Sequence, residues 1–251
     1  MKLVFSLVCC FSIAQSSTAS GQPIDLLAGD LLSQWVAADG SGFSGSNWTV
    51  AGGVLHLKPG GRDIFLDQSV GNFVLDWEFM ISPGGNSGIK YRVAKYGNSW
   101  LGCEYQIQDD PPNAQPRHTT GSLYEVYEPI TGSTSRPAGQ WNRARIVVCG
   151  NHVEHWLNGI LVVLANAGDY EWLDRVSKSK FKPHVGWGQN PTGRLMLQDH
   201  GSEVWFRNVY LTEFQAPYAT SVAQQVFETG RPQSRLRNAL SRPLRVLGRR
   251  H

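Results

Sequence analysis

The sequence predicts an all-β protein built from two antiparallel sheets with one short helix. Its 251 residues include 27 glycines and 9 tryptophans, whereas charged residues make up only 17%. Runs of β-branched and aromatic residues are separated by Gly, Asn and Pro clusters, which is the composition of strands joined by tight turns. The number of these runs is sufficient to form two stacked sheets.

The first 20 residues have the pattern of a secretory signal peptide. A basic start precedes the apolar run 3–14, and small residues follow up to a cleavage site near Ala19 or Ser20. The apolar run is too short to span a bilayer as a helix. After cleavage only Cys103 and Cys149 remain, so the fold cannot depend on a disulfide framework, and their pairing is left open.

Residues 21–215 are predicted to form one domain, followed by a basic and flexible tail at 216–251. No later apolar run reaches membrane-spanning length. The tail contains seven arginines and one acidic residue, a charge of +6 against +3 for the whole chain, which leaves −3 for the rest. The basic character therefore belongs to the tail. No nucleic-acid partner is expected, and the oligomeric state is not predicted.

Eleven segments are predicted as strands from their β-branched and aromatic content and the turn residues that flank them. They are Val50–Lys58, Asp63–Leu66, Asn72–Ser82, Gly88–Val93, Leu101–Gln108, Gly121–Tyr127, Asn142–Val148, Val153–Leu157, Ile160–Leu164, Leu195–Gln198 and Val204–Leu211.

Two local elements have specific signals. Asn158-Gly159 lies between two of the predicted strands, and this pair suits the positive φ values of a type I′ hairpin turn. The helix is predicted at Asp169–Lys180, where Asp169 can cap the N-terminus and Tyr170, Leu173 and Val176 have helical spacing.

Polar side chains gather on one face of two neighbouring strands, Ser87–Val93 and Leu101–Gln108. Because side chains alternate along a strand, one face of this pair is apolar and the other polar. The polar face carries Lys90, Arg92, Glu104, Gln106 and Gln108. This alternation is also typical of the solvated side of an antiparallel sheet, so function requires further support.

Familiar catalytic motifs are mostly missing. The sequence contains neither a GxxxxGK[ST] phosphate loop nor an HExxH zinc helix. His152 and His155 are three positions apart in a predicted strand, so they should point to opposite faces and should not bind one metal ion together.

Seven blocks, in order, resemble the 3-keto-disaccharide hydrolase family over residues 23–214. They are Trp77-Glu78-Phe79, Gly84 to Arg92, Glu104 to Asp110, Thr120 to Tyr124, Trp141-Asn142, Asn151 to Gly159, and Gln198 to Gly201 followed by Val204 to Asn208. The resemblance implies a concanavalin-A-like jelly-roll sandwich. It also implies an exported bacterial protein, periplasmic or extracellular, that acts on 3-keto-glycosides. Cys103 departs from the family pattern, in which proline is common at this position.

The implied substrate sets the chemistry that the site must perform. A ketone at C3 acidifies the C2 hydrogen, so a base can remove it and the enolate can expel the group at C1, with later addition of water. We expect Glu104 to be the base, Lys90 to stabilise the enolate, His200 to be the acid or a metal ligand, and Glu78 to belong to the same catalytic group. The expected substrate-binding residues are Arg92, Gln106, Asp109, Asp199 and Trp156.

Two alternatives follow from the same residues. Carboxylates, an amide and a histidine on one face could hold a divalent metal ion that polarises the ketone, although no ligand spacing identifies such a site. A non-catalytic, lectin-like module could instead use the same face to bind glycans.

Overall fold

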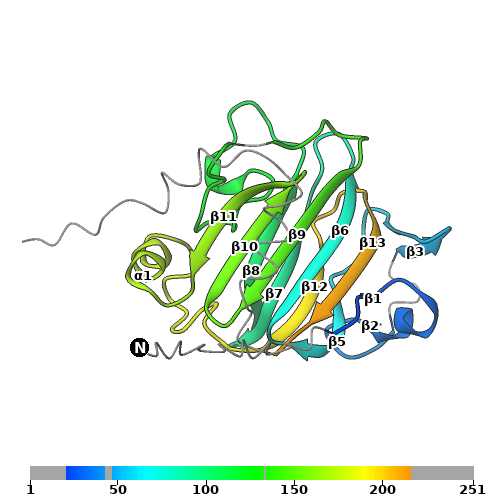
Figure 1. Ribbon diagram of the computed structural model, residues 1–251. Coiled ribbons are helices and arrows are strands. Elements are labelled where there is room, and N and C mark those ends of the chain that lie inside the picture. The colour runs from blue at the N-terminus through cyan, green and yellow to red at the C-terminus, as the bar shows by residue number, and fades with distance from the viewer. Residues whose placement is uncertain (1–20, 43–46, 133, 216–251) are drawn as a thin grey trace, which may run out of the picture.

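A computed structural model describes residues 21–42, 47–132 and 134–215, which form two antiparallel sheets packed face to face (Figure 1). The predicted signal peptide, residues 1–20, and the basic tail, residues 216–251, lie outside the described residues. None of the helices in the described part of the chain has the length and hydrophobicity that a membrane crossing requires.

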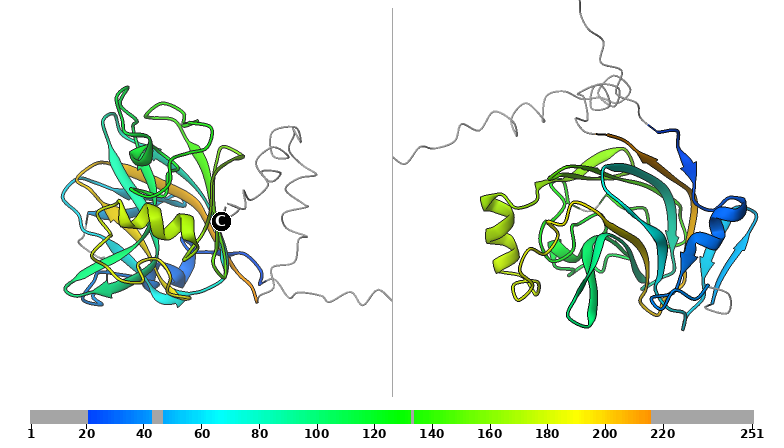
Figure 2. Two further views of the ribbon diagram at one scale, coloured as in Figure 1. Left: turned by 90° about the vertical axis from the view of Figure 1, so that its left-hand side faces the viewer. Right: turned by 90° about the horizontal axis from the view of Figure 1, so that it is seen from below.

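The larger sheet has the strand order β11-β10-β9-β6-β13-β4-β3, with β1 also paired to β13. The smaller sheet has the order β2-β5-β12-β7-β8. Neighbouring strands are often distant in sequence, as in a jelly roll, and Figure 2 shows that both sheets are curved. The strands are β1 (Ile24–Asp25), β2 (Trp35–Val36), β3 (Trp48–Ala51), β4 (Val54–Leu57), β5 (Ile64–Val70), β6 (Phe73–Ile81), β7 (Asn86–Tyr96), β8 (Ser99–Gln108), β9 (Asn142–Cys149), β10 (His152–Leu157), β11 (Ile160–Asn166), β12 (Gly193–Asp199) and β13 (Val204–Glu213).

The helices are short. Two 3-10 turns, η1 (Gly29–Gln34) and η2 (Pro116–His118), accompany one α-helix, α1 (Tyr170–Ser177), among the described residues. The expected all-β jelly-roll sandwich with one short helix is therefore confirmed.

Alternating large side chains from both sheets fill the core. Phe73 and Trp77 of β6 are buried and pack edge-on against Tyr91 and Tyr105 of the smaller sheet, with ring centroids 6.3 and 4.9 Å apart respectively. Burial of such aromatic side chains is a large part of the free energy that holds two sheets together. The sheets are consequently joined by apolar contacts rather than by disulfides, and Cys103 and Cys149 are both free thiols.

One histidine belongs to this core. His155 is fully buried, its Nε2 lies 2.9 Å from the Tyr91 hydroxyl, and its Nδ1 lies 3.0 Å from the Gly121 carbonyl oxygen. Burial lowers the pKa of His155 to about 4, so the ring is neutral at neutral pH. His152 points to the opposite side and contacts Glu154 at 2.8 Å. The expectation that the two histidines point to opposite faces of the strand is confirmed.

The local predictions differ in outcome. The hairpin at Asn158-Gly159 is confirmed, with φ values of 51° and 83°. The single strand predicted at Val50–Lys58 is wrong, because Gly52 and Gly53 adopt positive φ and divide it into β3 and β4. The predicted strand Gly121–Tyr127 is an irregular loop with only isolated bridges at Leu123.

Helix α1 begins as predicted but buries a different residue. Asp169 caps it by accepting a hydrogen bond from the Trp172 backbone N–H at 2.7 Å. The spaced residues Tyr170 and Leu173 are 88% and 50% exposed, whereas Trp172 is fully buried and stacks on Trp187. Helix α1 lies at the β11 end of the molecule, away from the β3 end (Figures 1 and 2).

Candidate active site

The outer face of the smaller sheet brings together a cluster of polar side chains from three adjacent strands. Lys90 of β7 is paired with Glu104 of β8, and Gly88 of β7 lies between Gln106 of β8 and Gln198 of β12. The residues between them, including Ile89, Tyr105 and Leu197, are buried in the core. Strand alternation therefore turns the polar side chains outward. The prediction that Lys90, Glu104 and Gln106 share one face is confirmed.

Glu104 and Lys90 are joined both directly and through Gln198. The Lys90 ammonium lies 3.7 Å from Glu104 Oε2. When the Gln198 side-chain amide is oriented to satisfy both groups, its nitrogen donates to Glu104 Oε1 and its oxygen accepts from Lys90 Nζ, each at 3.2 Å. Glu104 is only 5% exposed, so these groups largely replace the water around its carboxylate.

Gly88 provides the space that this arrangement needs. A Cβ at residue 88 would lie 2.8 Å from Glu104 Oε1 and 3.1 Å from Glu104 Cγ. The Glu104 side chain therefore lies across the bare backbone of β7 and reaches toward β12. No other residue type at this position would leave the carboxylate where it is.

Two carboxyl groups near Lys90 have raised pKa values. Burial raises the pKa of Glu104, and the Lys90 charge opposes that rise. Burial also raises the pKa of Asp63, which precedes β5 and whose Oδ1 accepts a hydrogen bond from the Asp199 backbone N–H at 2.9 Å. Lys90 again opposes the rise. A partly desolvated carboxylate beside a cation is a common arrangement for a catalytic base.

The other predicted residues on this face lie around Glu104. His200 follows β12, is exposed, and is close enough for its charge to act on Glu104 and Asp63. Gln106 Nε2 donates to Asn86 at 3.1 Å, whereas its buried Oε1 has no hydrogen-bond partner within the described residues. Asp199 and Asp109 each accept a backbone N–H, from Gly201 and Gly84 respectively, so they shape turns at the end of the cluster.

The expectation that Arg92 lies on this face is wrong. The register of β7 shifts between Tyr91 and Ala94, and Arg92 adopts a φ of 51°. A bulge of this kind reverses the faces that the following residues occupy. Arg92 is buried and donates to the backbone carbonyls of Gly188 and Gly150, the latter in the turn between β9 and β10 of the larger sheet.

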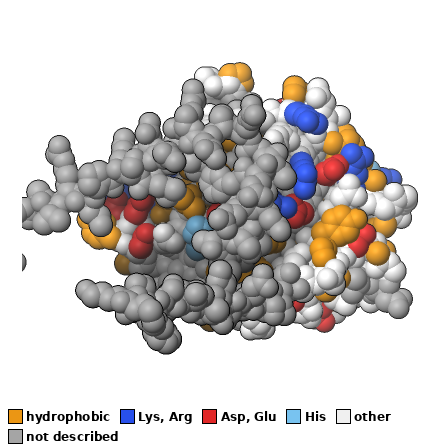
Figure 3. Space-filling view, in the orientation of Figure 1, with side chains coloured by type: hydrophobic (Ala, Val, Ile, Leu, Met, Phe, Trp, Pro, Cys, Tyr) orange, Lys and Arg blue, Asp and Glu red, His pale blue; other side chains and the backbone are white. Residues whose placement is uncertain are grey.

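Glu78 and Trp156 are also placed outside the cluster, because both belong to the larger sheet. Glu78 of β6 accepts a hydrogen bond from Arg207 at 2.7 Å, and Trp156 of β10 donates to Glu154 at 2.7 Å. Strand alternation places both on the outer face of that sheet. In the part of that face that is visible in Figure 3, basic and acidic side chains adjoin one another. Alternation assigns a residue to one face of its strand but does not say which sheet the strand joins.

Comparison with known proteins identifies the family. The family described as the 3-keto-alpha-glucoside-1,2-lyase-like domain matches residues 22–212. The chain belongs to this family. The membership that the sequence blocks indicate is thereby confirmed.

Individual proteins are similar to this chain over about 70% or more of its length. A Bacteroides thetaiotaomicron protein named 3-keto-disaccharide hydrolase is 32% identical over 207 residues, which cover 70% of this chain and 69% of that protein. A crystal structure of a Parabacteroides distasonis protein, proposed to be a glycosyl hydrolase, is 29% identical with a TM-score of 0.66 and covers 72% of this chain and 89% of that one. A second P. distasonis structure, 23% identical with a TM-score of 0.60, shows the same fold and covers 76% of this chain and 98% of the other.

Four residues of the family domain contribute to the cluster without having been predicted. They are Asp63, Gln198, Tyr124 and Lys180. The first two could be recognised only from the position of β12 between β5 and β7, which depends on long crossovers. Tyr124 lies beside Glu104, and the Lys180 ammonium lies 4.3 Å from the centroid of the Tyr124 ring.

The possibility that this face holds a divalent metal ion can be compared with the donor groups that are present. The described residues contain no group of three or more His, Cys, Asp or Glu side chains arranged to hold a metal ion. Around Glu104, the group adjacent to the carboxylate is instead the ammonium of Lys90.

Proposed function

We propose that the protein cleaves the glycosidic bond of 3-keto-glycosides, including 3-keto-disaccharides, by removing the C2 proton and eliminating the group at C1. Family membership and the curated relative named 3-keto-disaccharide hydrolase support the substrate class. The observation that carries the proposal is the buried Glu104 carboxylate held between Lys90 and Gln198.

Glu104 has the properties of the base. A carboxylate with an ordinary pKa is too weak to remove a C–H proton efficiently, and burial raises the pKa of Glu104 so that its ionised form is a stronger base. The C3 ketone acidifies the C2 hydrogen and makes the transfer feasible. The rate should therefore increase with pH as Glu104 ionises.

Lys90 is suited to stabilise the enolate. As Glu104 accepts the proton it becomes neutral, and the negative charge appears on the C3 oxygen of the substrate. The Lys90 ammonium, 3.7 Å from Glu104 Oε2, then interacts with the enolate instead of with the carboxylate. A fixed cation near the developing charge lowers the barrier because it requires no reorganisation during the reaction.

The remaining polar groups can bind the sugar. His200, Asp199 and Asp109 surround the cluster, where they can form hydrogen bonds with sugar hydroxyl groups, whereas Gln106 is 1% exposed and would act through its hydrogen bond to Asn86. Expulsion of the C1 oxygen produces an enone in the sugar ring, and addition of water to its C1–C2 double bond completes net hydrolysis. Lyase and hydrolase activities are thus two stages of one sequence.

The test compares a 3-keto-glucoside with its unoxidised parent. The 3-keto sugar should be cleaved and the parent should be inert, because its C2 hydrogen is not acidic. Glu104→Gln should lower turnover by about 10² to 10⁴ with little effect on binding. Deuterium at C2 should slow the wild-type reaction if proton removal limits it.

Three results would contradict the proposal in different ways. Full activity of Glu104→Gln would assign the base to another residue. Binding of both sugars without conversion of either would establish a glycan-binding module. Loss of turnover on chelation, with recovery on adding a divalent cation, would assign the electrophilic role of Lys90 to a metal ion.

We also infer that the protein is exported. The basic start and apolar run of residues 1–20 support this localisation. N-terminal sequencing of protein secreted by a bacterial host should give a chain that begins at about residue 20 or 21. A chain that retains Met1 would contradict export.

A further inference from the structure

A loop after η2 pairs with the free edge of β8 and brings Tyr124 beside the proposed base. Gly121 N–H donates to the Gln106 carbonyl at 2.9 Å, and Tyr124 N–H donates to the Glu104 carbonyl at 3.0 Å. Leu123 points into the core, so Tyr124 lies on the same outer face as Glu104. Side chains directly opposite each other across such a pairing have Cβ atoms about 5 Å apart.

The Tyr124 phenol is neutral and available. Partial burial and the negative charges of Glu104 and Glu125 raise its pKa above the ordinary value of 10.0. The Lys180 ammonium lies 4.3 Å from its ring centroid, and the His118 ring lies 4.8 Å from it. None of the hydrogen bonds between described side chains engages its hydroxyl group, so its proton can be donated to a ligand.

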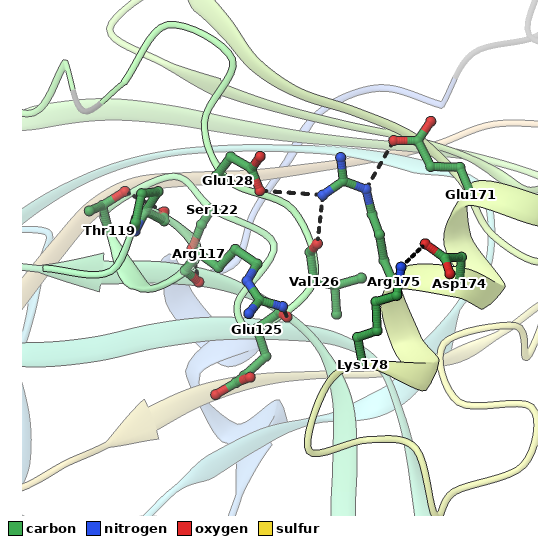
Figure 4. Close-up of polar contacts among 11 residues, drawn as sticks. Arg117, Thr119, Ser122, Glu125, Val126, Glu128, Glu171, Asp174, Arg175 and Lys178 are labelled. Atoms are coloured by element: carbon green, nitrogen blue, oxygen red, sulfur yellow. Dashed lines mark hydrogen bonds and ion pairs between the residues drawn. The ribbon is translucent and has the colours of Figure 1, made fainter.

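The loop that carries Tyr124 is held on both sides (Figure 4). Arg117 Nη1 donates to the Glu125 carbonyl at 2.9 Å, and Ser122 Oγ donates to the Arg117 carbonyl at 3.0 Å. Arg175 of α1 donates to the Val126 carbonyl and to Glu128 Oε2, each at 3.3 Å. Glu125 has a φ of 70°, a conformation that a non-glycine residue keeps only when its surroundings impose it.

We propose that Tyr124 is a further catalytic residue, which protonates the departing glycosidic oxygen from the edge of β8. This inference rests on the proposed elimination. Glu104 takes the C2 proton, the C2–H electrons form the C1–C2 double bond, the C1–O bond breaks with its electrons on oxygen, and Tyr124 gives that oxygen its phenolic proton. The leaving group departs as a neutral alcohol.

The surroundings also return the catalyst to its starting state. The Lys180 ammonium lies 4.3 Å from the centroid of the Tyr124 ring and stabilises the phenolate that forms, because opposite charges attract. After the step Glu104 is protonated and Tyr124 is deprotonated, and the two side chains are neighbours. Transfer of the proton from Glu104 to Tyr124, directly or through water, restores both groups without any external reagent.

The experiment uses the dependence of the rate on the leaving group. Tyr124→Phe and wild type are assayed with two 3-keto-glucosides, one with an alkyl aglycone and one with a nitrophenyl aglycone. An alkyl alkoxide needs protonation to depart, whereas nitrophenolate does not. With Tyr124→Phe, turnover of the alkyl substrate should therefore fall by about 10² to 10⁴ relative to wild type, which is the usual effect of a general acid. Turnover of the nitrophenyl substrate should fall by less than about tenfold.

Control variants separate this role from alternatives. Tyr170→Phe removes a phenol from a residue that is 88% exposed on α1, and should leave both rates unchanged. Glu104→Gln should lower both rates, because both substrates need the C2 proton removed. If Tyr124→Phe lowers both rates equally, or if His200→Asn alone shows the leaving-group effect, the assignment of Tyr124 is overturned. If wild type cleaves neither substrate, the elimination itself is overturned.

Discussion

Gly88 decides where the proposed base can lie. Its neighbours in β7 have side chains that pack or bind, but at residue 88 the space is taken by the carboxylate of Glu104. The glycine is therefore required by close approach and not by a turn, and it lies in a strand where it would otherwise weaken the sheet.

Gly88→Ala is expected to impair the reaction without unfolding the protein. The added Cβ would lie 2.8 Å from Glu104 Oε1, so the flexible end of that side chain must move away from Gln198 and Lys90. Misplacement of a reacting group by about 1 Å can cost about 10² in rate. Turnover of a 3-keto-glucoside and the thermal midpoint are measured together. Gly42→Ala, where a Cβ would meet nothing within 4 Å, is the matched control.

His155 is expected to make stability depend on pH. Its pKa falls from 6.5 to about 4 on folding, so between these values the unfolded chain binds a proton that the folded chain excludes. The neutral His155 ring contributes fully to the free energy of unfolding above pH 6.5, and this contribution is lost as the pH falls toward 4. The loss amounts to about 3 kcal/mol at most.

Denaturant unfolding of wild type and His155→Gln at several pH values tests this prediction. Glutamine can still hydrogen bond to Tyr91 and Gly121 but does not titrate. The difference in unfolding free energy between the two proteins should shrink by about 3 kcal/mol between pH 7.5 and pH 4. A difference that stays constant over this range would show that His155 does not titrate as described.

At the scale of elements, α1 fixes the loop that covers the edge of β8. Arg175 contacts Glu171 on its own helix and the Val126 carbonyl and Glu128 on the loop (Figure 4). Its guanidinium also lies 4.4 Å from the centroid of the Tyr127 ring. The guanidinium presents five N–H donors in a rigid planar fork, whereas the lysine ammonium is a compact charge with three donors at one point.

Arg175→Ala should lower kcat by about tenfold or more while the circular dichroism spectrum stays that of wild type, because the loop then holds Tyr124 less firmly. Lys178→Ala is the control. Lys178 is the C-cap residue of the same helix, and its ammonium pairs with Asp174 at 2.6 Å on an exposed surface. Equal losses of kcat in the two variants would show that the helix, and not the Arg175 contacts, is responsible.

The elements also show how far the sequence alone can lead. Alternation placed Lys90, Glu104 and Gln106 correctly because β7 and β8 pair without a register shift at these positions. It failed at Arg92 because the positive φ of the bulge is adopted by an arginine, so no glycine in the sequence indicates that a bulge is present. Glu78 and Trp156 were assigned to the wrong surface because sheet membership depends on contacts between segments distant in the chain. The family resemblance supplied the fold, whereas Gln198 and Asp63 required the strand order.

For the whole molecule, the sandwich is expected to be independent of the arginine-rich tail. Strand β13 ends at Glu213, and the family match ends at residue 212. Removal of residues 216–251 should therefore leave the thermal midpoint and the turnover of a 3-keto-glucoside unchanged, while the net charge becomes negative. A truncated protein that is insoluble or melts earlier would show that the tail packs on the sandwich.

The loop on the edge of β8 also affects how molecules of this protein meet one another. An uncovered edge strand presents N–H and C=O groups with which a strand of another chain can pair. Here the backbone groups of Glu104 and Gln106 are already bonded to the loop that carries Tyr124. Substitutions in this loop that change which aglycone is accepted would also disturb the backbone hydrogen bonds that keep other chains from pairing with β8. We therefore expect variants selected for new substrates at this edge to aggregate before they lose the ability to catalyse the reaction.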